Sequence, residues 1–438
     1  MLFYELLKIK KGFSVKKKII YFILAGLLST QANADPIYLD YQATTPVDPR
    51  VLESMLPYFT KEFGNPHSTT HVYGTRAHEA VERARAQVAN VINADPQEII
   101  FTSGSTEADN IAILGVSRAL KNQGKSEIIS VVTEHKAVLE PLKALEREGF
   151  KVILLPVQKN GIINISDLKK NLSSKTALVS VMAVNNEIGV LQPIQEIAKL
   201  AHEHGALFHT DAAQGFGKIP IDVKKDDIDL LSLSGHKIYG PKGIGALFIK
   251  KGTPVIPLVY GGGQERKIRP GTVPTPLSVG LGKAAQIAEQ ERIPESKRLL
   301  ALRNKLLNIL QKNLTGVIVN GDLEKRLPGN LNLSFAGVDS APLLSNLKGI
   351  AVSASSACSS DSLELSYVIQ AIDPEHTLPP AVIRLSLGRF TTEAEIEKAA
   401  EEIIRVVNDL REKNPTGGAR SCKAEDVDKI KKELLKNM

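Results

Sequence analysis

The chain has 438 residues, of which 43% are hydrophobic and 24% are charged, and its formal net charge is +7. This length predicts two to three domains, and the hydrophobic content is ample for a buried core. Residues 1–34 contain six lysines and one glutamate, a charge of +5, so the remaining residues carry only +2. Most of the net positive charge therefore lies in the N-terminal segment, and the charge of the remaining chain does not support nucleic-acid binding.

Residues 1–34 have the layout of a cleavable secretory signal peptide. Three lysines, Lys16–Lys18, precede the apolar run Ile19–Leu28, and Ala32–Ala34 provides a small-x-small cleavage site. The apolar run is too short to span a bilayer. This pattern predicts an exported, for example periplasmic, protein.

Short apolar runs alternate with helical patterns between about residues 95 and 250. The predicted strands lie near residues 128–133, 152–157, 177–184, 206–211, 229–234 and 245–249, and the predicted helices near 107–121, 136–148 and 193–204. Such alternation predicts an α/β fold with a wound, mostly parallel sheet and helices on both faces. Further along the chain, residues 299–314 and 393–410 have the pattern of amphipathic helices.

A strand, a tight turn and a helix follow one another at the start of this region. The strand covers Glu98–Thr102, the turn covers Ser103–Thr106, and the helix begins at Glu107. Backbone N–H groups at the start of a helix, with the Ser105 and Thr106 hydroxyls, can form an anion site. An ordinary N-cap is the alternative interpretation of the same turn.

Two later strands end in polar side chains that complement such an anion site. Asp211 ends one apolar strand, with Gln214 three positions on, and Lys237 follows another within a turn of small residues beside His236. A partly desolvated lysine suits Schiff-base chemistry, although most lysines after a strand are solvated surface charges. Pyridoxal phosphate enzymes combine such a lysine with a carboxylate that pairs with the pyridinium nitrogen. The lysine, the carboxylate and the anion site together predict this cofactor.

His135 follows the apolar strand that ends at Thr133. A lone histidine in this place is commonly a strand-end cap. If a cofactor ring lies beside it, its planar imidazole and its ordinary pKa of about 6.5 suit proton transfer. The other histidines lack the spacing of a metal site, so no metal is predicted.

Cys358 lies in a stretch of small polar residues, Ser353–Ser362. This composition favours a mobile loop over a packed element. A cysteine in such a loop is exposed and can reach into a pocket as a nucleophile, whereas the alternative is an incidental free thiol. The cofactor predicted elsewhere in the chain favours the catalytic interpretation.

Several ungapped motifs carry a resemblance to a known family: Phe101–Glu107, Thr133–Leu139, Val184–Val190, Leu231–Gly243 and Ser355–Cys358. Through them the chain resembles cysteine desulfurases of the NifS/IscS type, which are class V aminotransferase-like pyridoxal phosphate enzymes of fold type I. The similarity extends from about Pro36 to about Thr392. It implies a large α/β domain with a mostly parallel sheet and a smaller α+β domain.

The resemblance implies two groups of phosphate contacts. The contacts from the same subunit would be made by Ser105, Thr106, Ser234 and His236. Thr272 would reach the phosphate of the neighbouring subunit, which implies a homodimer with shared active sites.

The contacts to the cofactor ring are implied in the same way. Lys237 would hold the cofactor covalently, Asp211 would face the pyridine nitrogen and Gln214 the ring hydroxyl. His135 would stack on the ring face and transfer protons. Asn186 would meet the polar edge of the ring and also the substrate.

The implied activity is that of a cysteine desulfurase, a sulfurtransferase that converts L-cysteine to L-alanine. Arg384 would bind the substrate carboxylate with its planar guanidinium, although a surface ion pair is an equally open role. Lys237 would remove the α-proton, and the Cys358 thiolate would attack the substrate sulfur and keep it as a persulfide. The sulfur would serve iron-sulfur cluster or thiolated product synthesis, and a transient contact between Cys358 and a cluster stays open.

Two other functions remain as alternatives. One is a selenocysteine lyase or another class V lyase or aminotransferase, which is disfavoured because the serine-rich loop around Cys358 would have no purpose in transamination. The other is a catalytically silent scaffold or binding protein, suggested by the unusual leader and tail.

Four segments are expected along the chain. Residues 1–34 form the leader, and residues 35–290 form the large cofactor-binding domain, whose N-terminal segment also contributes to the small domain. Residues 291–414 form the small domain with the Cys358 loop. Residues 415–438 form a tail that departs from the family.

Departures from the family pattern weaken the inference of partners and compartment. Leu365 stands where the family usually has proline, Pro270 replaces a small polar residue, and the tail with Cys422 does not resemble the segment that docks an iron-sulfur scaffold. Delivery of sulfur to such a scaffold is therefore less secure than catalysis. Thiolate catalysis suits a reducing cytoplasm, whereas the leader predicts export, so the two indications of compartment conflict.

Overall fold

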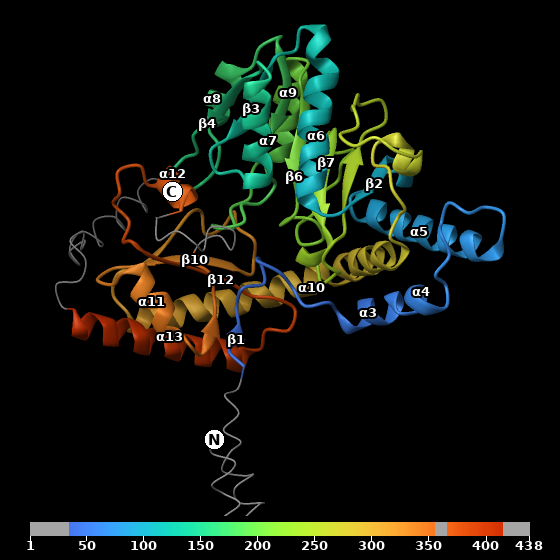
Figure 1. Cartoon of the computed structure of the whole chain (residues 1–438). Coiled ribbons are helices and arrows are strands. Elements are labelled where there is room, and N and C mark those ends of the chain that lie inside the picture. The colour runs from blue at the N-terminus through green and yellow to red at the C-terminus, as the bar shows by residue number, and fades with distance from the viewer. Residues whose placement is uncertain (1–34, 355–365, 415–438) are drawn as a thin grey trace, which may run out of the picture. The chain divides into compact units, whose positions relative to one another are not determined.

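The computed structural model describes residues 35–354 and 366–414 (Figure 1). The predicted leader, the predicted tail, Cys358 and Cys422 lie outside the described residues. Contacts divide the chain after Ile37, and the description below concerns the unit that begins at Tyr38. Within the described ranges, no helix is both long and apolar enough to cross a membrane.

A seven-stranded sheet forms the centre of this unit (Figure 1). Its strands are β2 (Ile99–Thr102), β3 (Glu127–Val131), β4 (Lys151–Leu155), β5 (Thr176–Ser180), β6 (Leu207–Asp211), β7 (Leu230–Ser234) and β8 (Gly245–Ile249). The spatial order is β2-β8-β7-β6-β5-β3-β4. The strands from β4 to β7 are paired in parallel, while β8 runs antiparallel to both β7 and β2.

The mostly parallel sheet and the six predicted strands between residues 128 and 249 are confirmed. The strand predicted at 177–184 ends earlier, at Ser180. The chain turns soon after this point, because the Asn185 side chain accepts hydrogen bonds from the N–H groups of Glu187 and Ile188.

Helices cover both faces of the sheet, as predicted (Figure 1). One face carries α6 (Ser105–Leu120) and α7 (Lys136–Arg147), and the other carries α5 (Val72–Val91), α9 (Ile194–Glu203) and α10 (Thr275–Asn313). Successive side chains of a strand point to opposite faces. Accordingly, Leu230 of β7 belongs to the core beneath α6 and α7, whereas Leu231 belongs to the core beneath the other three helices.

A smaller α+β part follows, as predicted. Its elements are β9 (Val317–Val319), β10 (Asn330–Phe335), α11 (Ser340–Asn346), β11 (Ile350–Ala351), α12 (Tyr367–Ile372), β12 (Ala381–Ser386) and α13 (Glu393–Lys413). The strands β12, β10 and β9 form an antiparallel sheet in that order. A capping box between Thr392 and Glu395 starts α13, close to the predicted beginning of that helix.

Helix α10 is 39 residues long and contains the predicted helix at 299–314 except for its last residue, Leu314, which is the C-cap. It begins at Thr275, well before the prediction, and continues through Pro294. A Cβ atom on Gly282 would lie 2.6 Å from the Ala84 backbone, so this glycine allows α10 to approach α5 closely. The expected boundary near residue 290 falls inside α10, and the division into domains stays a prediction.

The remaining elements are short and connect these parts. They are β1 (Ile37–Tyr38), α3 (Pro49–Met55), α4 (Pro57–Thr60), η2 (Pro96–Glu98), η3 (Lys121–Gln123), α8 (Ile165–Asn171), η4 (Gly235–Lys237) and η5 (Gln264–Lys267).

Candidate active site

A cavity of about 220 Å³, the front cavity, lies where β6 and β7 end. It is lined by Gln42, Ala43, Ser105, Thr106, His135, Met182, Val184, Asn186, Asp211, Ala213, Gln214, His236, Lys237 and Arg384. Among the predicted site residues that the structure describes, only Ser234 and Thr272 do not line it. Ligands of open α/β sheets bind at the carboxyl ends of the strands, which is where this cavity lies.

Lys237 reaches the front cavity from the short helix η4 that follows β7. Its Nζ donates hydrogen bonds to the backbone carbonyls of Gln42, at 2.7 Å, and Ala43, at 2.8 Å. The turn that carries the lysine is held by Thr45, whose Oγ1 donates to the His236 carbonyl and accepts from the Tyr239 N–H. The N-terminal segment therefore fixes both the lysine and its turn.

Helix α6 begins at the front cavity without a side-chain cap. The N-cap residue is Gly104, so the N–H groups of the first turn are not satisfied by an N-cap side chain. The next two residues, Ser105 and Thr106, line the cavity. Free N–H groups at a helix start attract anions, and this geometry supports the predicted anion site over the ordinary N-cap.

His236 and Ser234 lie near this helix start. Burial, together with the nearby Lys237 charge, lowers the pKa of His236 to about 4, so its ring is neutral near pH 7. Its Nδ1 is 3.0 Å from the Thr44 hydroxyl. Ser234 is buried at the end of β7.

Asp211 ends β6 and is 5% exposed. Its Oδ1 accepts a hydrogen bond of 2.8 Å from the Ala213 N–H. Burial raises the pKa of Asp211, while His135, this hydrogen bond and Lys237 act in the opposite direction. A cationic ring nitrogen would offset the cost of burying the carboxylate here.

His135 is the N-cap residue of α7, and its Nδ1 accepts a hydrogen bond of 3.1 Å from the Ala137 N–H. His135 therefore caps a helix start and not the strand end that was expected as the alternative, and the same ring also lines the front cavity. Because Nδ1 is an acceptor, the proton of the neutral imidazole lies on Nε2. Burial, more than any charge, lowers the pKa of His135.

Arg384 comes from β12 and is 2% exposed. Its guanidinium donates to the Asn186 carbonyl at 2.8 Å and to the Asp40 carboxylate at 2.7 Å. The arginine thus forms an ion pair, but a buried one and not at the surface. Its Nε and the Asn186 Oδ1 are buried and find no hydrogen-bond partner among the described residues. Two unsatisfied polar atoms in one cavity indicate a place for a ligand.

Thr272 is exposed in the segment before α10 and does not line the front cavity. Among residues 35–354 and 366–414, no group of three or more His, Cys, Asp or Glu side chains could hold a metal ion.

Comparisons with known proteins identify the family. The Aminotransferase class-V family model matches residues 37–399. Cysteine desulfurase IscS of Ehrlichia chaffeensis is 55% identical over 87% of this chain and 93% of its own length, and that of Rickettsia africae is 54% identical over 87% and 93%. A solved structure of a NifS-like protein has a TM-score of 0.80 and 37% identity, covering 85% of this chain and all of that one. The structure of SspA in complex with cysteine has a TM-score of 0.72 and 37% identity, covering 81% and 100%.

The chain belongs to the cysteine desulfurases of the class-V aminotransferase family. These are pyridoxal phosphate enzymes of fold type I, so the predicted fold, cofactor and enzyme class are confirmed. The roles of individual residues remain predictions.

The front cavity of this desulfurase fits pyridoxal phosphate. The uncapped start of α6 would hold the phosphate, Asp211 the ring nitrogen and Lys237 the aldehyde carbon. Asn186 Oδ1 and Arg384 Nε supply the unsatisfied polar atoms that a ligand would complete. The cofactor would supply an electron sink, which the side chains of the cavity lack.

Some residues of the desulfurase site escaped sequence reasoning. Behind Asp211, the His209 ring lies between the hydroxyls of Ser180, at 2.8 Å, and Ser232, at 3.0 Å, with the Asp109 carboxylate at 3.6 Å. Burial lowers the pKa of His209 to about 3. A histidine within an apolar strand was the one available signal for this group. The backbone carbonyls of the N-terminal segment had no such signal.

Proposed function

We propose that this desulfurase takes sulfur from L-cysteine through the Cys358 thiolate, with Lys237 and His135 as proton carriers. One arrangement supports the proposal: Lys237, Asp211 and the uncapped start of α6 face the same cavity as Arg384. Bound pyridoxal phosphate would delocalise the negative charge that develops on the substrate α-carbon. The cysteine desulfurase relatives favour this function over a selenocysteine lyase, an aminotransferase or a silent scaffold.

Arg384 binds the substrate carboxylate in this proposal. Two of its nitrogens are already engaged by the Asn186 carbonyl and by Asp40, which fixes the plane of the guanidinium. The Nε–H remains for the carboxylate. A fixed guanidinium loses little conformational freedom when the substrate binds.

Lys237 and His135 carry the protons. The carbonyls of Gln42 and Ala43 hold the Lys237 amine at the cavity wall, from which it can accept the substrate α-proton when it is neutral. The lowered pKa of His135 keeps its ring neutral near pH 7, and because Nδ1 is engaged by the Ala137 N–H, the Nε2–H is the proton that the ring can donate in the front cavity.

Cys358 lies outside the described residues, and its role follows from its place in the family motif. Its thiolate attacks the substrate sulfur, so an S–S bond forms and the C–S bond breaks. The electron pair of the broken bond passes to the substrate carbon skeleton, which takes up protons to give alanine. The sulfur stays on Cys358 as a persulfide.

Purified full-length protein incubated with L-cysteine and a thiol reductant should produce alanine and sulfide in equal amounts. Cys358→Ser should abolish both products while the cofactor stays bound, whereas Cys422→Ser should leave both unchanged. Unaltered alanine formation by Cys358→Ser would contradict the persulfide route. Absence of alanine with the wild type, despite bound cofactor, would favour a silent protein.

The proposed assembly is a homodimer, in which Thr272 reaches the neighbouring site. Large apolar side chains that are 48%, 65% and 82% exposed, at Tyr73, Phe63 and Tyr260, support a protein partner on this unit. Sedimentation should give the mass of two chains. In a mixture of Lys237→Ala and Thr272→Ala chains, shared sites would make turnover differ from the sum of the separate proteins.

The sulfur acceptor and the compartment are linked proposals. An iron-sulfur scaffold is the proposed acceptor because the relatives are named IscS. The leader pattern favours export, while a reactive thiolate favours a reducing compartment. N-terminal sequencing of the native protein tests whether it is exported. A start near Asp35 supports cleavage and export, and an intact Met1 contradicts both.

A further inference from the structure

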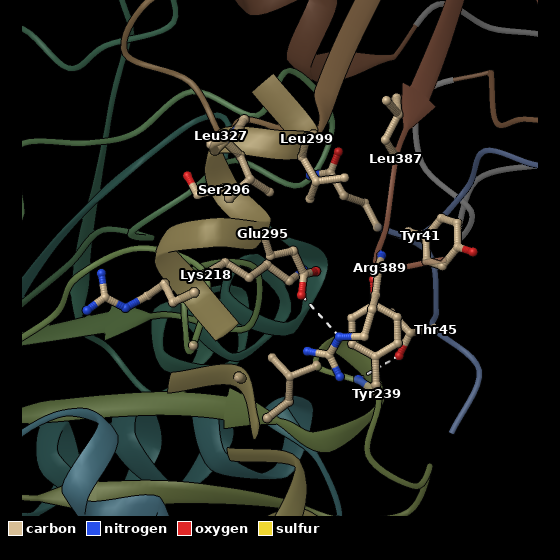
Figure 2. Close-up of a pocket in the computed structure, with 17 residues that line it drawn as sticks. Tyr41, Thr45, Lys218, Tyr239, Glu295, Ser296, Leu299, Leu327, Leu387 and Arg389 are labelled. Atoms are coloured by element: carbon tan, nitrogen blue, oxygen red, sulfur yellow. Dashed lines mark hydrogen bonds and ion pairs between the residues drawn. The ribbon is translucent and has the colours of Figure 1, made fainter. Parts of the chain in front are cut away.

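A second cavity, the rear cavity, is lined by residues of α10, of the N-terminal segment and of the segment after β12 (Figure 2). It offers about 50 Å³, which holds roughly three to five water molecules. Gln42 lines both cavities and so forms part of the wall between them. Figure 2 shows Lys218, Tyr239, Glu295 and Arg389 around this space.

A chain of hydrogen bonds crosses this wall from one lysine to the other. Lys218 Nζ, in the rear cavity, lies 3.4 Å from Gln214 Oε1, and Gln214 Nε2 donates to the Gln42 carbonyl at 2.9 Å. The same carbonyl accepts from Lys237 Nζ at 2.7 Å. Gln214 lines the front cavity, so its amide is held from behind.

The two ends of the Gln214 amide are not interchangeable here. A protonated lysine has only donors, and a carbonyl oxygen has only acceptor sites. If the amide were flipped, its NH₂ group would face the Lys218 ammonium and its oxygen would face the Gln42 carbonyl. With Lys218 protonated, both contacts would be repulsive, so Lys218 and Gln42 together select one orientation even though the lysine contact is long; with Lys218 neutral, the Gln42 carbonyl alone selects it.

The backbone places Lys218 at this wall. Gly217 has φ +68°, and a Cβ atom there would lie 2.8 Å from the Ala288 Cβ of α10. The glycine therefore lets the chain pass close to α10 and turns the next residue toward the rear cavity. Lys218 also follows Gln214 by four positions, which suits the contact between their side chains.

The charges around Lys218 come from several elements. They are Lys237 and His236 on η4, Tyr239 after it, Tyr41 in the N-terminal segment, Arg292 and Glu295 on α10, and Arg389 after β12. Burial, and after it the Lys237 charge, lowers the pKa of Lys218 to about 7, while Glu295 opposes the change. The rear cavity gives water access to this amine.

We propose that Lys218 is a positioning residue, which holds Gln214 with its amide nitrogen toward Gln42 and the front cavity. The proposal rests on the proposed function of that cavity. In this orientation Gln214 presents a donor to an oxyanion such as the ring hydroxyl of the cofactor. The positive charge of Lys218 adds to this effect, because the charge and the Gln214 donor both stabilise negative charge in the front cavity.

The test compares Lys218→Met with Lys218→Arg and with Ser296→Ala, a control that lines the rear cavity without touching Gln214. The measured quantity is the pH midpoint of the visible absorbance band of the cofactor bound through Lys237. Lys218→Met removes the Lys218 charge and releases the Gln214 amide from its orientation as a donor. Both changes favour the protonated form of the bound cofactor, so the midpoint should rise by roughly one pH unit. Lys218→Arg and Ser296→Ala should keep the wild-type midpoint.

An unchanged midpoint in Lys218→Met would overturn the proposal, as would an equal shift in Ser296→Ala. If Lys218→Met does not bind the cofactor, the same midpoint is measured in Lys218→Gln, which removes the charge and shortens the reach to Gln214. A raised midpoint in Lys218→Gln supports the proposal, and a wild-type midpoint overturns it. A failure of the proposed function would show separately, as absence of alanine formation by the wild type.

Discussion

The front and rear cavities share Gln42 but differ in how their polar side chains are satisfied. In the front cavity, Arg384 Nε and Asn186 Oδ1 are buried and find no partner among the described residues. In the rear cavity, Arg389 donates to Asp48 at 2.9 Å and to Glu295 at 3.0 Å, and its guanidinium lies 4.2 Å from the centre of the Tyr239 ring.

This difference separates a place for a ligand from a place of support. A buried polar atom without a partner costs about 1–3 kcal/mol, so such atoms are expected where a ligand completes them. In a paired network, hydrogen bonds and ion pairs within the protein offset the cost of burying the polar atoms. Substitutions of the unsatisfied groups in the front cavity should therefore affect chemistry, and substitutions in the paired network of Arg389 should affect stability.

The largest expected effect is the loss of chemistry in Lys237→Ala. Without the amine, neither covalent attachment of the cofactor nor removal of the α-proton is possible, and turnover should fall on the order of 10⁴-fold or more. Alanine formation measures this. The exposed lysine of the same turn, Lys242, provides the control, since Lys242→Ala should keep turnover within about twofold. Comparable turnover in both variants would break the assignment of the front cavity.

Next in size is the loss of stability in Arg389→Ala. This substitution leaves the Asp48 carboxylate, whose side chain is 2% exposed, with the half-exposed Arg50 as its remaining ion-pair partner, and it also removes the ion pair to Glu295. The free energy of unfolding should fall by about 3–5 kcal/mol, as measured in urea. Arg405→Ala removes an arginine that is 56% exposed and should cost at most about 0.5 kcal/mol. Equal losses would show that the rear network is not a support.

A pH effect is expected from His209 behind the front cavity. Its folded pKa of about 3 lies below the ordinary value of about 6.5, so between these values the unfolded state binds the extra proton. The stability associated with neutral His209 is therefore lost as pH falls through this range, on the order of 3–5 kcal/mol in all. His209→Gln should flatten the acid limb of unfolding free energy against pH.

His202 is the matched control with the opposite sign. Its pKa is raised, first by the hydrogen bond to Asp229, so its contribution is present at low pH and is lost as pH rises through the raised value. His202→Gln should leave the acid limb steep. If both variants flattened the acid limb equally, the buried position of His209 would not be the cause.

The smallest expected effect is in Thr45→Val, which borders the rear cavity but supports the front one. Valine removes the hydroxyl that binds the His236 carbonyl and the Tyr239 N–H. The cost should be about 1–2 kcal/mol, together with weaker retention of the cofactor in equilibrium dialysis. Thr70→Val at an exposed position should change neither quantity. A cofactor affinity that stays at the wild-type value would show that the turn of Lys237 needs no such support.

Sequence reasoning identified the strands and most of the front cavity because both follow from local patterns. Asp211 and Lys237 follow neighbouring parallel strands, whose carboxyl ends meet at one edge of the sheet. Ser105 and Thr106 begin the helix that follows β2. A residue at such an edge is predictable once the strand is recognised, without knowledge of any distant contact.

The features that were missed depend on contacts between distant segments. Pro294 normally interrupts a helix, yet α10 continues through it, and Gly282 in the part that was not predicted packs against the distant helix α5. The burial of Arg384 depends on Asp40, which is 344 positions away. Nothing local at either position signals the other.

The hydrogen bonds of Lys237 also constrain when the site can form during synthesis. Its carbonyl partners, Gln42 and Ala43, leave the ribosome early, whereas the lysine follows them by more than 190 positions. Arg384 and Arg389, which complete the two cavities, are made later still. A nascent chain halted before Arg389 therefore carries the reactive amine without the finished cavity. Cofactor binding is expected only after the chain has been synthesised through Arg389.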